Sequence, residues 1–66
     1  MPTIFFYGPE LSSDKKRDLI KSFTDKASEL TGINASAFVV YLQETDADEV
    51  GVGGKLLADR FKDQGE

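Results

Sequence analysis

Two apolar segments lie on either side of a single amphipathic segment, and this order constrains the fold more than any other feature. Residues 3–7 read Thr-Ile-Phe-Phe-Tyr, and residues 37–42 read Ala-Phe-Val-Val-Tyr-Leu. β-Branched and aromatic residues favour strands, and the second run, which lacks polar alternation, is typical of a strand covered on both faces. A helical crossover of roughly 20 residues between two buried strands predicts a parallel, right-handed βαβ unit.

The amphipathic segment predicts a helix over residues 13–31. Ser12 or Ser13 can cap its N-terminus, and Gly32 stands where a left-handed residue would end it. Its apolar residues recur at helical spacing: Leu19, Ile20, Phe23, Ala27 and Leu30.

The last third of the chain is expected to be a short appendage. Residues 45–49 are polar and acidic, and we interpret them as a solvated turn rather than a cation site because their spacing does not match that of an EF-hand loop. Residues 50–54, Val-Gly-Val-Gly-Gly, predict a loop or tight hairpin. Leu56, Leu57 and Phe61 suggest a short terminal turn of helix or an extended arm, and residues 62–66 are expected to fray.

The chain is too short to complete this fold alone. Its 66 residues make one domain, residues 1–66, and a chain of about this length buries only about 60% of the surface exposed when unfolded. Disulfides are excluded and zinc is nearly so, because there is no Cys and no His. Two strands and one helix also leave a sheet face and two edges open, so we expect a homo-oligomer.

Charge and hydropathy restrict the partners. The net charge of −4 repels a phosphate backbone, so nucleic acid is not an expected partner. No apolar stretch approaches the roughly 20 residues of a membrane span, and the N-terminus does not resemble a signal peptide, so no membrane partner and a cytoplasmic location are expected. The glycine-rich stretch matches neither phosphate-binding motif, GxGxxG or GxxxxGK[ST].

The side-chain inventory leaves few routes to catalysis. Without His or Cys there is no catalytic triad or thiol nucleophile, and the strand residues Tyr7 and Tyr41 are more typical of a core or interface than of proton donors. If Met1 is removed, Pro2 becomes a free secondary amine, and desolvation beside a buried strand would lower the pKa of that amine. Position alone, however, favours an ordinary second residue.

Four segments together carry a family resemblance: Met1-Pro2-Thr3-Ile4, residues 12–20, residues 37–44 and Gly51-Val52-Gly53-Gly54-Lys55-Leu56. In order and spacing the chain resembles the 4-oxalocrotonate tautomerase family. The resemblance implies an α+β fold, a single βαβ unit with a C-terminal β-hairpin whose sheet is completed by dimerisation, with three dimers forming a hexamer. It also implies that Pro2 is a general base that interconverts enol and keto forms without a cofactor or metal.

The chain departs from the family at the substrate pocket. Well-known members carry an arginine before the helix, a second arginine in the second strand and an aromatic residue before the hairpin. In the same register this chain has Leu11 (beside Glu10), Val39 and Val50, so these substrate-binding positions are apolar.

Other residues are candidates for the missing donors. Tyr41 shares a strand face with Val39 and is a candidate donor to an enolate oxygen. Replacement cations could come from Lys15, Lys16 and Arg17 near the helix start, or from Arg60 on the terminal arm.

The resemblance implies a tautomerase or isomerase that acts on a small enol, a 2-hydroxydienoate or an arylenolpyruvate-like enol, and forms the corresponding 2-keto acid. Pro2 would take a proton from the enol and return it at carbon. Two alternatives remain open: a non-catalytic oligomeric module with the same fold, and a dehalogenase or decarboxylase that uses Pro2 differently.

Overall fold

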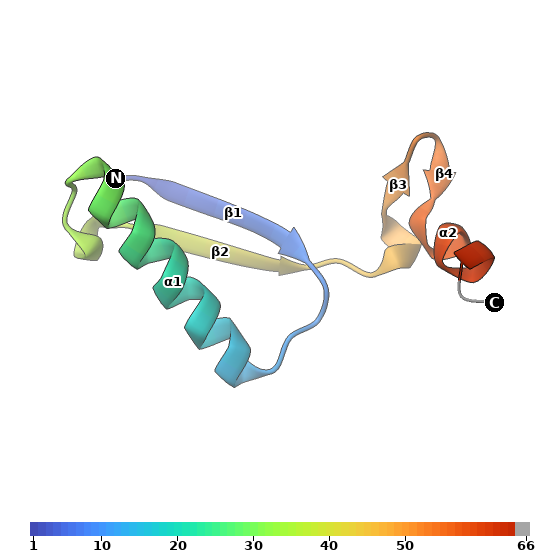
Figure 1. Ribbon diagram of the computed structural model, residues 1–66, viewed down its shortest axis with the longest axis horizontal. Helices are drawn as coiled ribbons and strands as arrows, with labels where there is room; N and C mark the ends of the chain where they lie inside the picture. Colours follow the sequence, from blue (N-terminus) through green and yellow to red (C-terminus); the bar gives the residue numbers. More distant parts are fainter. Residues whose placement is uncertain (65–66) are drawn as a thin grey trace.

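The computed structural model describes residues 1–64, and the side chains of residues 1–61. Eight elements follow one another along the chain (Figure 1): β1 (Thr3–Gly8), α1 (Ser13–Thr31), η1 (Ala35–Ala37), β2 (Val39–Glu44), η2 (Ala47–Glu49), β3 (Gly51–Val52), β4 (Lys55–Leu56) and α2 (Leu57–Gln64). The βαβ unit occupies one end of the molecule, and the hairpin with α2 occupies the other.

Strands β1 and β2 are parallel, as the two apolar segments predict, and they pair from Thr3 opposite Val39 to Gly8 opposite Glu44. The second strand was expected to start at residue 37, but β2 starts at Val39 because residues 35–37 form a 3₁₀ turn. The Asn34 side chain accepts a hydrogen bond from the Ser36 N–H at 2.9 Å, and such local side-chain bonds compete with strand pairing.

Helix α1 has the predicted bounds, residues 13–31. Ser12 is the N-cap, and its hydroxyl oxygen accepts a hydrogen bond from the Lys15 N–H at 3.3 Å. Gly32 ends the helix in the left-handed region at φ 74°, with its N–H donating to the Ser28 carbonyl. Both ends of α1 therefore follow from local sequence signals.

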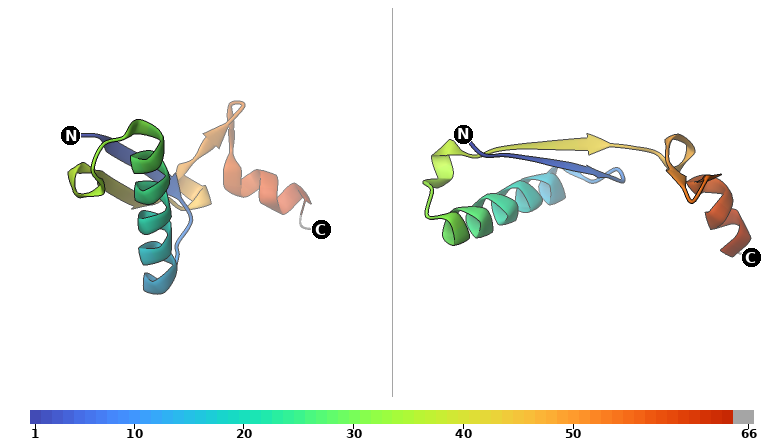
Figure 2. Two further views of the ribbon diagram at one scale, coloured as in Figure 1. Left: turned by 60° about the vertical axis from the view of Figure 1, so that its left-hand side comes forward. Right: turned by 90° about the horizontal axis from the view of Figure 1, so that it is seen from above.

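Helix α1 covers one face of the β1–β2 sheet, and the other face is bare (Figure 2). In β1 the side chains alternate, with Ile4 and Phe6 half-buried and Phe5 exposed. The ring centroids of Phe6 and Phe23 lie 5.6 Å apart between the sheet and α1. The Lys16 ammonium contacts the Glu44 carboxylate at 2.8 Å, which joins the start of α1 to the end of β2.

The hairpin forms as predicted. Strands β3 and β4 are antiparallel, and Gly53 and Gly54 connect them at φ 60° and 83°. Positive φ at both central residues is characteristic of the type I′ turn that suits the twist of a hairpin.

The end of the chain is more ordered than expected. Leu57, the first residue of α2, donates a hydrogen bond from its N–H to the Val50 carbonyl at 2.7 Å. The expected fraying is wrong for residues 62–64, which continue α2, because each residue added to an existing helix gains a hydrogen bond without a new nucleation cost. The rest of the expected frayed segment, residues 65 and 66, lies outside the described residues.

A single chain has no closed core. None of the side chains that the structure describes is fully buried, and the radius of gyration is 15.5 Å, against about 11 Å for a compact domain of this length. The expectation that the second strand is covered on both faces therefore fails within one chain: Tyr41 is 54% exposed. Over residues 1–64, neither helix has both the length and the apolar character that crossing a bilayer requires.

Candidate functional site

Pro2 lies at the open beginning of the sheet. Its carbonyl accepts a hydrogen bond from the Val39 N–H at 3.0 Å, so β2 fixes the backbone of the residue that leads into β1. Met1 precedes it with 91% of its surface exposed. The backbone of Pro2 is thus held by strand pairing, whereas the residue before it projects from the sheet.

The bare face of the sheet starts next to Pro2 and is largely aromatic. Side chains on this face come from alternate positions of both strands, with Thr3 opposite Val39 and Phe5 opposite Tyr41. The rings of Phe5 and Tyr41 are stacked, with centroids 5.0 Å apart and planes 10° apart. Tyr41 and Val39 therefore share this face, as the period-two rule predicts.

The other predicted site residues lie elsewhere. Leu11, in the loop after β1, borders a shallow groove along the first turns of α1 with Lys15 and Asp18. Val50 and Arg60 belong to the arm, residues 50–64, which contains the hairpin and α2 and lies at the far end of the molecule. The six residues of β1 span about 20 Å at 3.3 Å per residue, so Pro2 and this second group do not meet within one chain.

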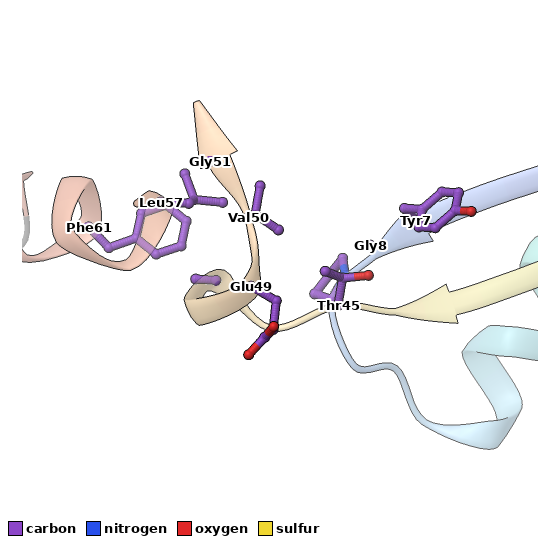
Figure 3. Close-up of a pocket in the computed structure, with 10 residues that line it drawn as sticks. Tyr7, Gly8, Thr45, Glu49, Val50, Gly51, Leu57 and Phe61 are labelled. Carbon is purple, nitrogen blue, oxygen red and sulfur yellow. The ribbon is translucent and has the colours of Figure 1, made fainter. Parts of the chain in front are cut away.

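A cleft of about 580 Å³ opens between the end of the sheet and the arm (Figure 3). Of the residues that line this cleft, only Val50 was predicted from the sequence as a site residue. Leu57 and Phe61 are one helical turn apart, and this spacing could have indicated an apolar helix face at this position. The lining of the cleft combines three segments: Tyr7, Gly8 and Pro9 after β1; Thr45, Ala47, Glu49, Val50 and Gly51 around η2; and Leu57 and Phe61 of α2.

The charged groups of α1 are largely paired with one another or with the sheet. The Arg17 guanidinium contacts Asp14 at 3.0 Å, and the Lys26 ammonium contacts Glu29 at 3.6 Å. The hydrogen bond that Lys21 donates to Asp25 and the charge of that carboxylate raise the pKa of Lys21. Among the residues that the structure describes, no group of three carboxylates could hold a metal ion.

Comparison with known proteins identifies relatives of this chain. The model of a family described as "Tautomerase enzyme" matches residues 2–60. A 2-hydroxymuconate tautomerase from Bacillus subtilis (strain 168) is 33% identical over 48 residues, which cover 73% of this chain and 77% of the relative.

Solved structures share the fold. The crystal structure of DmpI from Archaeoglobus fulgidus is 43% identical with a TM-score of 0.81, over 88% of this chain and 100% of that one. YwhB, described as a homologue of 4-oxalocrotonate tautomerase, is 30% identical with a TM-score of 0.81, over 88% and 97% of the two chains. These matches confirm the α+β fold and the family expected from the residues: the chain belongs to the tautomerase enzyme family.

Proposed function

We propose that this chain is a cofactor-independent tautomerase in which the amine of Pro2, freed by removal of Met1, is the general base. The observation that carries the proposal is the placement of Pro2. It is the second residue of the chain, its carbonyl is held by the Val39 N–H at 3.0 Å, and it immediately precedes Thr3, the first residue of β1. The family match also begins at this residue.

The reaction needs only one group that takes up a proton and returns it. The unprotonated amine of Pro2 takes the hydroxyl proton of a 2-hydroxydienoate or an arylenolpyruvate-like acid, and the O–H electron pair forms the C=O bond as the enol double bond shifts. The protonated amine then gives the same proton to carbon, which produces the ketone. No atom or electron enters from outside, so the step is an isomerisation.

The surrounding residues have supporting roles in this proposal. The Tyr41 hydroxyl donates a hydrogen bond to the enolate oxygen, which stabilises the charge that develops there. Val39 forms an apolar wall beside Pro2. Leu11 and Val50 form further apolar walls, and each is supplied by a neighbouring copy, because within one chain both lie beyond the far end of β1.

The proposed active form is a homo-oligomer, and we propose a hexamer built from three dimers. Its support is the absence of any fully buried side chain among those described together with the exposed aromatic face of Phe5, Tyr7 and Tyr41, which are 64%, 70% and 54% exposed. Contact with further copies removes this surface from water and contributes the missing core.

The experiment compares the wild-type protein with Pro2→Ala. Intact mass should show a chain lacking Met1, and ketonisation of 2-hydroxymuconate or phenylenolpyruvate should be followed by ultraviolet absorbance. Pro2→Ala should lose activity by at least about 100-fold, because general-base catalysis contributes about 10²–10⁴-fold. Wild-type activity should fall as the pH decreases and the Pro2 amine binds a proton.

Two results would contradict the proposed function. A protein that retains Met1 or leaves both enols unchanged, while forming the same oligomer, would instead be a non-catalytic module. Equal activity of the wild type and Pro2→Ala would exclude Pro2 as the base.

A further inference from the structure

The end of the sheet that holds Pro2 is built from two stretches of neutral side chains. The first is residues 2–9, and the second is residues 30–43, which cover the end of α1, η1 and most of β2. The Val39 N–H joins the two stretches through its hydrogen bond to the Pro2 carbonyl at 3.0 Å. Glu44, the first charged residue of β2, is paired with Gly8 at the other end of the sheet. A ligand at Pro2 therefore lies against hydroxyl, aliphatic and aromatic groups of these strands.

The cations of the chain are paired or lie away from Pro2. Four cations on α1 contact carboxylates: Lys16 with Glu44, Arg17 with Asp14, Lys21 with Asp25 and Lys26 with Glu29. Among the described side chains, three cations are outside these pairs: Lys15, Lys55 and Arg60. Lys15 adjoins Lys16, whose contact with Glu44 at 2.8 Å lies at the end of β2, and the other two belong to the arm beyond it (Figure 1). Within one chain, no unpaired cation of the described residues accompanies Pro2.

The bare face of the sheet offers aromatic surface instead of charge. Phe5 and Tyr41 are stacked with centroids 5.0 Å apart and remain 64% and 54% exposed. Phe5 follows Pro2 by three residues, which corresponds to about 10 Å along a strand. A small acid whose enol lies at Pro2 can therefore extend toward these rings.

From this distribution of charge we infer that the substrate is a monocarboxylic enol with an uncharged remote end, best an aryl group, rather than a dicarboxylate. The inference rests on the proposed function. Both classes of acid carry a carboxylate next to the enol, so they differ only at the remote end. A second carboxylate loses its water there without a charged partner, which is unfavourable, whereas an aryl ring gains apolar contact and can stack on the exposed rings.

The first experiment compares three substrates of the wild-type protein by kcat/KM, each divided by the rate of ketonisation without enzyme in the same buffer. 2-Hydroxymuconate and 2-hydroxypenta-2,4-dienoate differ only in the remote carboxylate, and phenylenolpyruvate carries a ring instead. The value for 2-hydroxymuconate should be at least about tenfold below that for 2-hydroxypenta-2,4-dienoate, because one charge is left unpaired. Phenylenolpyruvate should give the highest value of the three.

A second experiment places a cation on the bare face. Thr3 is an exposed residue of this face and adjoins Pro2, and Thr3→Lys should raise the ratio of kcat/KM for 2-hydroxymuconate to that for 2-hydroxypenta-2,4-dienoate by about tenfold. Thr3→Gln, the matched control with a long uncharged side chain, should change the ratio by less than about twofold. Each ratio comes from one preparation, so an altered active fraction or an altered pKa of the Pro2 amine affects both substrates alike.

The contribution of the rings is tested with Phe5→Leu, which keeps an apolar side chain but removes the stack. The ratio of kcat/KM for phenylenolpyruvate to that for 2-hydroxypenta-2,4-dienoate should fall by about threefold or more, because an aromatic pair is lost. Native mass spectrometry checks that the oligomer is unchanged. An unaltered ratio in the same oligomer would show that the aryl group does not lie on these rings and would contradict the preference for an aryl end.

The inference and the proposed function fail in different ways. If the wild type converts 2-hydroxymuconate as efficiently as 2-hydroxypenta-2,4-dienoate while Pro2→Ala is inactive on both, the inference is wrong and the proposed function stands. A cation from elsewhere in the oligomer would then bind the remote carboxylate. If none of the three enols is ketonised, the proposed function fails and the inference fails with it.

Discussion

At the scale of single residues, Pro2 and Tyr41 are held in place near the start of the sheet by different interactions. Pro2 is held through its backbone, by the hydrogen bond from Val39 at 3.0 Å. Tyr41 is held through its ring, which stacks on Phe5 at 5.0 Å and leaves the hydroxyl with no protein partner among the hydrogen bonds of the described residues. The stack fixes where that hydroxyl can point, which suits a hydrogen-bond donor.

Tyr41→Phe tests the hydroxyl separately from the ring. The stack on Phe5 remains, so the melting temperature should stay within about 2 °C, while kcat should fall by about tenfold because one hydrogen bond to the developing enolate is lost. Steady-state kinetics and thermal melting of the same preparation provide both numbers. An unchanged kcat would assign Tyr41 to packing alone.

At the scale of elements, the hairpin determines where the arm points. Strands β3 and β4 are two residues each, so the turn at Gly53 and Gly54 and the bond from Leu57 to Val50 hold the start of α2. Both turn positions have positive φ, which glycine adopts without strain, and this explains why two adjacent glycines occupy the turn. Hydrogen bonding of this short segment thus places Val50, Arg60 and Phe61 together on the arm.

Gly54→Ala should destabilise the protein by about 1–2 kcal/mol, because φ is 83° at this position and an L-residue is strained there. A Cβ at Gly54 would meet no atom within 4 Å, so the cost is backbone strain rather than a clash. Gly51→Ala is the matched control: its Cβ would lie 3.8 Å from the Lys55 carbonyl oxygen, an ordinary contact. Urea unfolding measures both, and equal losses would refute the argument from strain.

Individual elements also show how far local signals extend. The bounds of α1 could be predicted because Ser12 and Gly32 act within one turn of the helix. The start of β2 could not, because the Asn34 side chain bonds to the Ser36 N–H, a local alternative that an apolar run does not reveal. The continuation of α2 through Gln64 was missed for a related reason, since its charged sequence carries little apolar periodicity.

At the scale of the whole molecule, the proposed assembly couples folding to association with other copies. The chain measures 45 × 26 × 16 Å and exposes four large aromatic side chains: Phe5, Tyr7, Tyr41 and Phe61. We therefore expect the isolated monomer to have a low free energy of unfolding. In the proposed assembly, the surface that another copy covers supplies the hydrophobic stabilisation that a single chain lacks. The proposed site depends on the same contacts, because the two groups of predicted residues lie at opposite ends of β1.

Melting temperature should therefore increase with protein concentration, as expected when folding and association are coupled. Thermal unfolding followed by circular dichroism over a 100-fold range of concentration measures this shift, and native mass spectrometry reports the oligomer at each concentration. A melting temperature independent of concentration, with a folded monomer in the mass spectrum, would contradict the proposed assembly.

The local structure and the set of available chemical groups follow from the amino-acid sequence alone. Two apolar runs, one capped amphipathic helix and a Gly-Gly turn were sufficient for the βαβ unit and the hairpin, because periodicity, caps and positive φ act over a few residues. The absence of His and Cys removed the usual catalytic groups, and the family resemblance then made Pro2 the candidate base. Which candidate residues lie together does not follow from the sequence, because distances between segments depend on strand pairing and on the direction of the arm. The three-dimensional fold places Pro2, Val39 and Tyr41 towards one end of the sheet. It places a second group beyond the other end: Leu11, Val50 and Arg60.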